Sequence, residues 1–217
     1  MICSAKVSRI MTACATFGRR KGKSRVVCPP RKGRLQSYDE IVKDYVENWR
    51  PHVSEELRHF AKQPSLACAI RVSSLAIDEC GKRHPHQRRI PGLLLKHFAQ
   101  GLARRENAIR RCEDFAQLIA VVESVAATIW KNARLTVYDT AHRIGIFRHI
   151  APDFVYIHAG TREGAVALGF SPRAPFVVPA DFPREFRRLK PYELEDCLCS
   201  YKEDLKEIAQ TRTRSSQ

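Results

Sequence analysis

The strongest constraint on the fold is a helical repeat of apolar residues between positions 112 and 130. Its members are spaced mainly three or four positions apart: Phe115, Leu118, Ile119, Val122, Val125, Ala126 and Ile129. This spacing places an apolar stripe along one side of an α-helix, and such a stripe has to be buried against other elements. We therefore expect a helix over 112–130 at the centre of a helical core.

Similar patterns along the chain predict further helices. Ser37 and Glu40 form a capping box that begins one helix, and Pro51 should end it because proline lacks the amide that a helix interior needs. Other helices are expected over 54–64, 65–81, 93–104, 135–147, 162–169 and 191–209, with one short strand at 154–158. The predicted fold class is therefore mainly α, a compact multi-helix domain over 37–210 with a basic N-terminal arm over 1–36 and a polar tail over 211–217.

The charge balance indicates an anionic partner. The chain has 38 Lys and Arg residues against 23 Asp and Glu residues, a net charge of +15. The arm over 1–36 contains basic residues and no acid, so it could displace counterions from a phosphate backbone; its candidate contacts are Arg20, Lys21 and Lys23. We expect DNA, double-stranded, as the partner, while a solvated tail or an organelle transit peptide remains the alternative for the arm.

Other sequence features limit where the protein could act. No apolar run approaches the roughly 20 residues that span a bilayer, and the first residues lack a secretory signal, so we expect no membrane association. The eight cysteines are scattered through the chain, which favours free thiols in a reducing cytosol over a disulfide framework. The expected location is cytoplasmic and nucleoid-associated, and no obligate protein partner is evident.

The spacing of cysteines and histidines along the chain indicates whether a structural metal site is expected. The candidates are Cys80 with His84 and His86, and the pair Cys197 and Cys199. Neither group has the two-residue spacing between cysteines that is typical of structural zinc. We therefore expect no metal and no cofactor.

The stretch from Trp130 to Ile144 carries the clearest candidate for chemistry. It places Asp139 among four cationic or titratable residues, which are Lys131, Arg134, His142 and Arg143. A carboxylate there would repel a phosphate, but it would stabilise the oxocarbenium-like sugar that forms when an N-glycosidic bond breaks. The same carboxylate could orient or deprotonate the attacking water.

The segment Val137-Tyr138-Asp139-Thr140-Ala141-His142-Arg143-Ile144 resembles the Val-Asp-Thr-His-x-x-Arg-Val/Ile segment of helix-hairpin-helix DNA glycosylases. The resemblance covers about eight residues, with Tyr138 inserted and His142 displaced by one. It implies that Asp139 is the catalytic residue of a helical base-excision enzyme. The nucleophilic lysine of the family has no counterpart, which implies hydrolysis of the base without lyase activity.

The chain departs from that family at the hairpin. Ile90-Pro91-Gly92 has the start of a hairpin, but it lacks the second glycine and lies too early in the chain. In another register, residues 131–136 are the hairpin turn, and the catalytic position then falls towards 155–158, where the chain has no aspartate. Both registers remain open at this point.

Several further residues complete the predicted site. His158 precedes the loop of Thr161 and Arg162 and is a second catalytic candidate, because small residues before a helix expose amides to an anion. An extruded base would stack on aromatic rings in a pocket formed by Trp130, Tyr138, His142 and Tyr156. The remaining predicted DNA contacts are Arg88, Arg89, Lys131, Asn132, Arg134, Thr136 and Arg143, together with Thr161 and Arg162.

These patterns favour a DNA glycosylase that flips out a modified base and hydrolyses its glycosidic bond, either in repair or in defence against modified phage DNA. The alternative is a non-enzymatic DNA-binding protein that grips the phosphate backbone. A nuclease or an RNA-binding protein is a third hypothesis, and the lack of an Asp/Glu cluster at metal spacing disfavours a two-metal nuclease.

Overall fold

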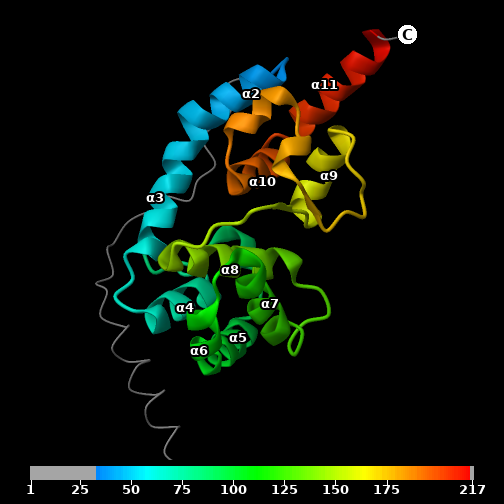
Figure 1. The fold of residues 1–217 in the computed structure, drawn as a ribbon. Helices are drawn as coiled ribbons and strands as arrows, with labels where there is room; N and C mark the ends of the chain where they lie inside the picture. Colours follow the sequence, from blue (N-terminus) through cyan, green and yellow to red (C-terminus); the bar gives the residue numbers. More distant parts are fainter. Residues whose placement is uncertain (1–32, 216–217) are drawn as a thin grey trace, which may run out of the picture.

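A computed structural model describes residues 33–215 of the chain, and the fold over this range is almost entirely helical (Figure 1). The α-helices are α2 (Tyr38–Asp44), α3 (Arg50–Ala61), α4 (Leu66–Leu75), α5 (Gly92–Arg104), α6 (Glu106–Arg111), α7 (Phe115–Ala126), α8 (Arg134–Arg148), α9 (Ala159–Ala167), α10 (Pro191–Ser200) and α11 (Lys202–Ser215). Shorter elements are the π-helix η2 (Tyr45–Trp49), the 3-10 helices η3 (Pro85–Gln87), η4 (Pro179–Asp181) and η5 (Arg184–Arg188), and the strands β1 (Val155–Tyr156) and β2 (Phe176–Val177). The predicted mainly α fold class is confirmed; Arg20, Lys21 and Lys23 lie outside the described residues.

The helices gather around two hydrophobic clusters (Figure 1). One contains α2, α9, α10 and the β1–β2 pair and is centred on buried side chains such as Tyr45, Phe186 and Leu198. The other contains α4 to α8 and is centred on residues such as Phe98 and Leu118. Helix α3 runs from the first group to the second, where it packs against α8.

Helix α7 confirms the central helix that the apolar repeat predicts, although it is shorter than expected. It begins after Asp114, whose side chain accepts a hydrogen bond from the Gln117 amide at 2.8 Å. Within the repeat, five side chains are fully buried and the remaining two are half-buried at Ile119 and Ile129. The separate short helix α6 precedes α7 and was not predicted.

The predicted helix end at Pro51 is wrong, because the helical path continues from α2 through η2 into α3. Pro51 lies in the first turn of α3, where its missing amide costs no interior hydrogen bond. The π-helix before it shifts the pairing by one residue, so the Arg50 amide donates to the Tyr45 carbonyl.

Other predicted elements also differ from the structure in their extent: α4 ends at Leu75 rather than at 81, and α9 begins at Ala159 rather than at 162. The last helix is interrupted at Tyr201, whose buried ring anchors the break and whose hydroxyl donates to Asp44 Oδ2 at 2.7 Å. The predicted strand shrinks to β1, which pairs antiparallel with β2 so that Val155 faces Val177. The partner strand lies in the proline-rich stretch, where a sequence pattern gives no strand signal.

The cysteines only partly follow the expectation of free thiols. Cys80, Cys112, Cys197 and Cys199 form no disulfide. Cys68 is disulfide-bonded, so the expectation is wrong at that residue. Separately, none of the helices described between residues 33 and 215 is long and apolar enough to cross a bilayer.

Candidate functional site

Helix α8 is the element that positions the candidate site. It packs against α3, α4 and α7 and also contacts η3, so different sides of the helix face different neighbours. Gly145 permits one close approach, because a Cβ at this position would lie 2.4 Å from the Ile150 carbonyl oxygen. Because α8 has neighbours on several sides, side chains that are adjacent in its sequence face different neighbours.

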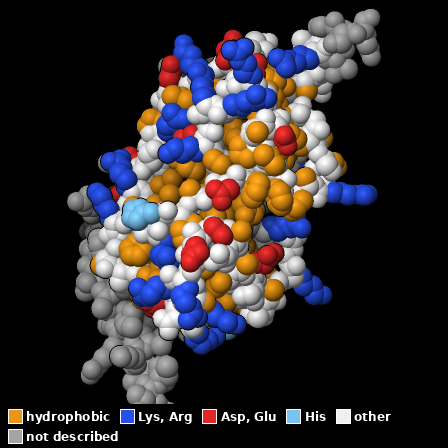
Figure 2. Space-filling view, in the orientation of Figure 1, with side chains coloured by type: hydrophobic (Ala, Val, Ile, Leu, Met, Phe, Trp, Pro, Cys, Tyr) orange, Lys and Arg blue, Asp and Glu red, His pale blue; other side chains and the backbone are white. Residues whose placement is uncertain are grey.

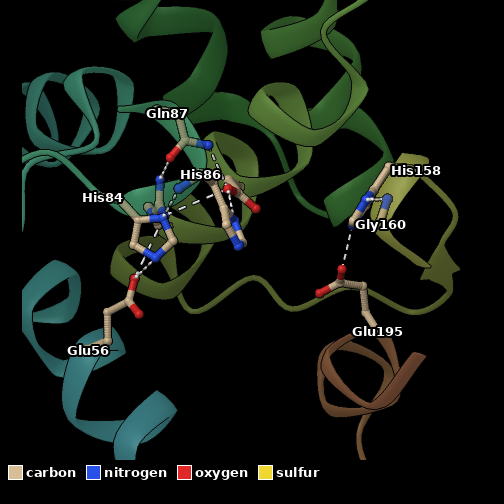
Figure 3. A network of polar contacts seen from close by, with 9 residues as sticks. Glu56, His84, His86, Gln87, His158, Gly160 and Glu195 are labelled. Carbon is tan, nitrogen blue, oxygen red and sulfur yellow. Dashed lines mark hydrogen bonds and ion pairs between the residues drawn. The ribbon is translucent and has the colours of Figure 1, made fainter. Parts of the chain in front are cut away.

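Asp139 lies on α8 and contacts His86 and Gln87 of the loop that contains η3, and Figure 3 shows these two side chains close together. Its Oδ2 accepts a hydrogen bond from Gln87 Nε2 at 2.6 Å and lies 2.9 Å from His86 Nδ1. An ionised carboxylate only accepts hydrogen bonds, so the proton of this contact belongs to His86 Nδ1. The His86 side chain is 45% exposed and the Asp139 side chain 11% exposed, so the pair reaches the surface through the histidine ring.

Arg143 lies one turn further along α8 and stabilises the same carboxylate. Its guanidinium is only 5% exposed and lies 3.8 Å from Asp139 Oδ2 and 3.7 Å from Glu56 Oε1. The guanidinium also stands 5.2 Å from the centre of the Phe60 ring. This burial explains why Arg143, predicted as a phosphate contact, is not presented at the surface.

His84 completes the cluster from the η3 side. Its Nε2 lies 3.4 Å from Glu56 Oε1, and its Nδ1 accepts the His86 amide at 3.2 Å. Since Nδ1 accepts a hydrogen bond, Nε2 carries the ring proton and donates it to Glu56. The name Asp139 cluster is used for the six residues of this network, which are Glu56, His84, His86, Gln87, Asp139 and Arg143.

The pKa values in this cluster follow from its charges. Burial alone would raise the pKa of Asp139, but the hydrogen bond from His86 and the charge of Arg143 outweigh it and hold the pKa well below its ordinary value. Burial alone would lower the pKa of His86, but the hydrogen bond and charge of Asp139 raise it. Glu56 also has a lowered pKa, because His84 and Arg143 outweigh its burial. Both carboxylates are therefore ionised at neutral pH.

A pocket opens on the other side of α8, between α7 and the β1–β2 pair. The space between its atoms, including the open mouth, is about 600 Å³. Aromatic rings of Tyr138, Tyr156 and Phe176 line it, together with the charged side chains of Glu123 and Arg134. This lining is typical of small-molecule sites, which are mostly apolar with a few polar groups.

Tyr138 connects this pocket to the interior through a row of rings. Its ring centre lies 5.8 Å from that of His142, 5.7 Å from Tyr156 and 6.0 Å from His158. Tyr138 Oη and His142 Nε2 are both buried and have no hydrogen-bond partner among the described residues. Burial lowers the pKa of His142 to about 4, so this ring is neutral at pH 7.

His158 lines the pocket and forms a second histidine–carboxylate pair with Glu195 (Figure 3). Its Nδ1 accepts the Gly160 amide at 3.2 Å as part of the N-cap of α9, so Nε2 is the nitrogen that donates to Glu195 on α10. Burial raises the pKa of Glu195, although His158 acts in the opposite direction. Both ring nitrogens of His158 are engaged, so none is left to contact a ligand.

The structure brings some predicted site residues together and separates others. Tyr138, Tyr156, His158 and Arg134 line one pocket, and His142 stacks against Tyr138. Trp130 lies apart, with its ring 5.2 Å from Phe98 in the second hydrophobic cluster. The predicted DNA contacts that are exposed are Arg88, Arg89, Lys131, Asn132, Arg134 and Arg162, whereas Thr136, Arg143 and Thr161 are buried.

Asp139 does not line the pocket, contrary to the expectation that acid and base pocket form one centre. Residues 138 and 139 are about 100° apart around a helix, which turns their side chains toward different neighbours. Sequence reasoning also missed Glu56 and Glu195. No local pattern could have identified them, because each is brought to its histidine by packing between separate helices.

Comparison of this chain with models of protein families, with curated protein sequences and with solved structures found no match. A function therefore has to be argued from the residues of the site. The resemblance to helix-hairpin-helix DNA glycosylases stays a prediction from the sequence.

Proposed function

We propose that this protein binds DNA and holds one extruded base in the pocket between α7, α8 and the β1–β2 pair. The observation that carries the proposal is the lining of that pocket by Tyr138, Tyr156 and Phe176. A base that leaves a duplex loses its stacking partners, and aromatic faces replace them. Phe176 is 43% exposed, so an aromatic surface is available at the mouth of the pocket.

The charged groups near the pocket support a nucleic-acid ligand. Arg134 lines the pocket, and Lys131 and Asn132 precede it as exposed residues in the turn before α8. Figure 2 shows lysine and arginine side chains toward the periphery of one face, with hydrophobic side chains and some Asp and Glu side chains across its middle. Cations beside a pocket lined by aromatic rings suit a ligand that has a phosphate backbone and a base with a flat apolar surface.

The test is a DNA duplex that carries 2-aminopurine at a mismatch. We expect binding to change the fluorescence of this base, because the pocket removes it from the stack. Tyr156→Ala should abolish the change while the protein still binds the duplex through its cations. Trp130→Phe, which alters a ring outside the pocket, is the control and should behave like the unaltered protein. An equal signal from the Tyr156 variant would refute the pocket as the base site.

A second candidate function is hydrolysis of the glycosidic bond, and the Asp139 cluster favours it. Asp139 is held ionised beside the half-exposed His86, in a loop that also carries the exposed Arg88 and Arg89. A carboxylate in this state can stabilise an oxocarbenium-like sugar. Since Asp139 does not line the pocket, the sugar would have to approach from the side of His86.

Alkali treatment after incubation distinguishes the two candidates. A hydrolase leaves abasic sites that break in alkali, and we expect Asp139→Asn to remove these breaks while DNA binding is retained. Asp153→Asn, at an exposed acid, is the matched control. Intact DNA across a broad panel of modified bases would leave binding as the function and exclude hydrolysis.

A further inference from the structure

His84, His86 and Asp139 form a group of potential metal ligands that the sequence spacing did not indicate. Each offers one ligand atom, and the three atoms lie within 4.8 Å of one another. Asp139 is 53 positions away from His86 in the chain, so the spacing of neighbouring residues does not place it beside the histidines. The fold therefore supplies the third ligand from α8 to a pair of histidines on the η3 loop.

The tautomer of His84 favours this interpretation. Glu56 holds the Nε2 proton, and the lone pair of Nδ1 accepts the His86 amide at 3.2 Å, so a metal at Nδ1 would take the place of this hydrogen bond. Metal-bound histidines commonly donate their other ring N–H to a carboxylate, which orients the ring and increases the basicity of the ligand atom. His84 is 7% exposed, so the ring is fixed by its surroundings rather than by solvent.

The formal charges of the cluster favour a bound cation. Glu56 and Asp139 each contribute one negative charge, and Arg143 contributes one positive charge. The two carboxylates outnumber the one guanidinium, so a divalent cation between the histidines would be attracted to the cluster.

We propose that His84, His86 and Asp139 bind a divalent cation of the zinc class, which displaces to solvent the proton that lies between His86 Nδ1 and Asp139 in the free protein. Two imidazole nitrogens and one carboxylate oxygen suit zinc better than magnesium, which prefers oxygen ligands and retains its waters. Three protein ligands leave a fourth position open, as in catalytic rather than structural zinc sites. Glu56 orients His84 in this arrangement, and Gln87 holds Asp139 through Oδ2.

The direct test is a zinc titration of the full chain against a chromophoric chelator, in the absence of DNA. The protein is first treated with EDTA and dialysed. We expect one zinc equivalent that is lost, or weakened more than about 100-fold, in His86→Ala and in Asp139→Asn. His97→Ala, at an exposed histidine on α5, is the control and should retain that equivalent. Thiols that also bind zinc are unchanged in all four proteins, so they cancel in the comparison.

Two further measurements show whether a variant fails to bind zinc because a metal ligand is missing or because the protein is unfolded. Zinc should raise the melting temperature of the unaltered protein and of His97→Ala, but not of His86→Ala. The His86 side chain is 45% exposed, so we expect His86→Ala to remain folded. Glu56→Gln keeps all three ligands and should weaken zinc about 10-fold to 100-fold through the orientation of His84. Zinc binding that is equal in the unaltered protein and in His86→Ala, or no zinc binding by the unaltered protein, would overturn the proposal.

Discussion

The two histidine–carboxylate pairs of this protein use the same residue chemistry in different surroundings. His86 contacts Asp139 through Nδ1, and its ring is 45% exposed. His158 contacts Glu195 through Nε2, its other nitrogen accepts a backbone amide, and its side chain is only 3% exposed. The first pair joins a loop to α8, and the second joins the start of α9 to α10.

The carboxylates of the two pairs differ in the direction of their pKa shifts, although each side chain is 11% exposed. The hydrogen bonds and the charge of Arg143 overcome burial at Asp139 and lower its pKa, whereas burial prevails at Glu195 and raises its pKa. The difference shows that a nearby guanidinium and several donors decide whether a buried acid stays charged. The Asp139 pair therefore keeps an ionised carboxylate beside an exposed ring, as the proposals above require, whereas the Glu195 pair joins two helices in the interior.

The largest expected effect comes from removing the buried histidine. His158→Ala deletes the N-cap of α9 and leaves Glu195 buried without its partner, so we expect a loss of about 3–5 kcal/mol in the free energy of unfolding. His86→Ala, at the half-exposed ring, should cost no more than about 1 kcal/mol. Urea unfolding of the two variants measures both values. Similar losses in the two variants would remove the distinction between the pairs.

A smaller effect is expected in the pH dependence of stability. The pKa of Glu195 is raised above its ordinary value of 4.5 by burial, although His158 opposes this, so the folded state binds the proton more tightly than the unfolded state. Its contribution to stability is therefore complete below pH 4.5 and is lost as the pH rises through the folded pKa. Glu195→Gln should remove this decline.

The measurement is the urea midpoint of the unaltered protein and of Glu195→Gln from pH 4.5 upward. The quantity compared is the difference between the two midpoints at each pH. Asp196 also has a raised pKa, because of burial and of the charge of Glu195, but it is present in both proteins. A difference that grows with pH in favour of Glu195→Gln supports the assignment. Parallel curves would mean that Glu195 has the same proton affinity in the folded and unfolded chain.

The smallest effect concerns the cations near each pair. Arg89 lies exposed in the loop of His86, whereas Lys202, in the part of the fold that contains Glu195, contacts Glu163 at 3.0 Å. If DNA approaches the exposed pair, Arg89→Ala should lower the slope of log affinity against log salt by about 0.9, since one phosphate contact is lost. Lys202→Ala should leave the slope unchanged. Fluorescence anisotropy at several salt concentrations provides both slopes, and an unchanged slope for Arg89→Ala would place the DNA elsewhere.

The sequence predicted the helical fold well where the signals were local. The apolar repeat of α7 and the capping serines before α2 and α4 act within four residues of their targets. The same local reasoning failed at Pro51, because the helix adjusts through a π-helical turn and tolerates the proline in a first turn. A local rule cannot show such an adjustment, since it depends on how α2 and α3 pack on their neighbours.

The candidate site was predictable only in part. Asp139, His158, Tyr138 and Tyr156 were identified as chemistry-bearing residues by their types and neighbours in the chain. Their grouping was not predictable, because the sequence does not show that Asp139 turns to the η3 loop while Tyr138 turns to the pocket. One predicted centre thus became two sites on different sides of α8.

By itself, the sequence determined the helical class, the positions of most helices and the excess of positive charge. These properties follow from side-chain spacing and composition, which act over a few residues or over the whole chain without reference to its path. Only the tertiary structure decided that His86 meets Asp139 across 53 positions and that His158 meets Glu195 across 37. Such contacts form when packed helices bring distant side chains together, and the burial that results sets whether each acid keeps its charge.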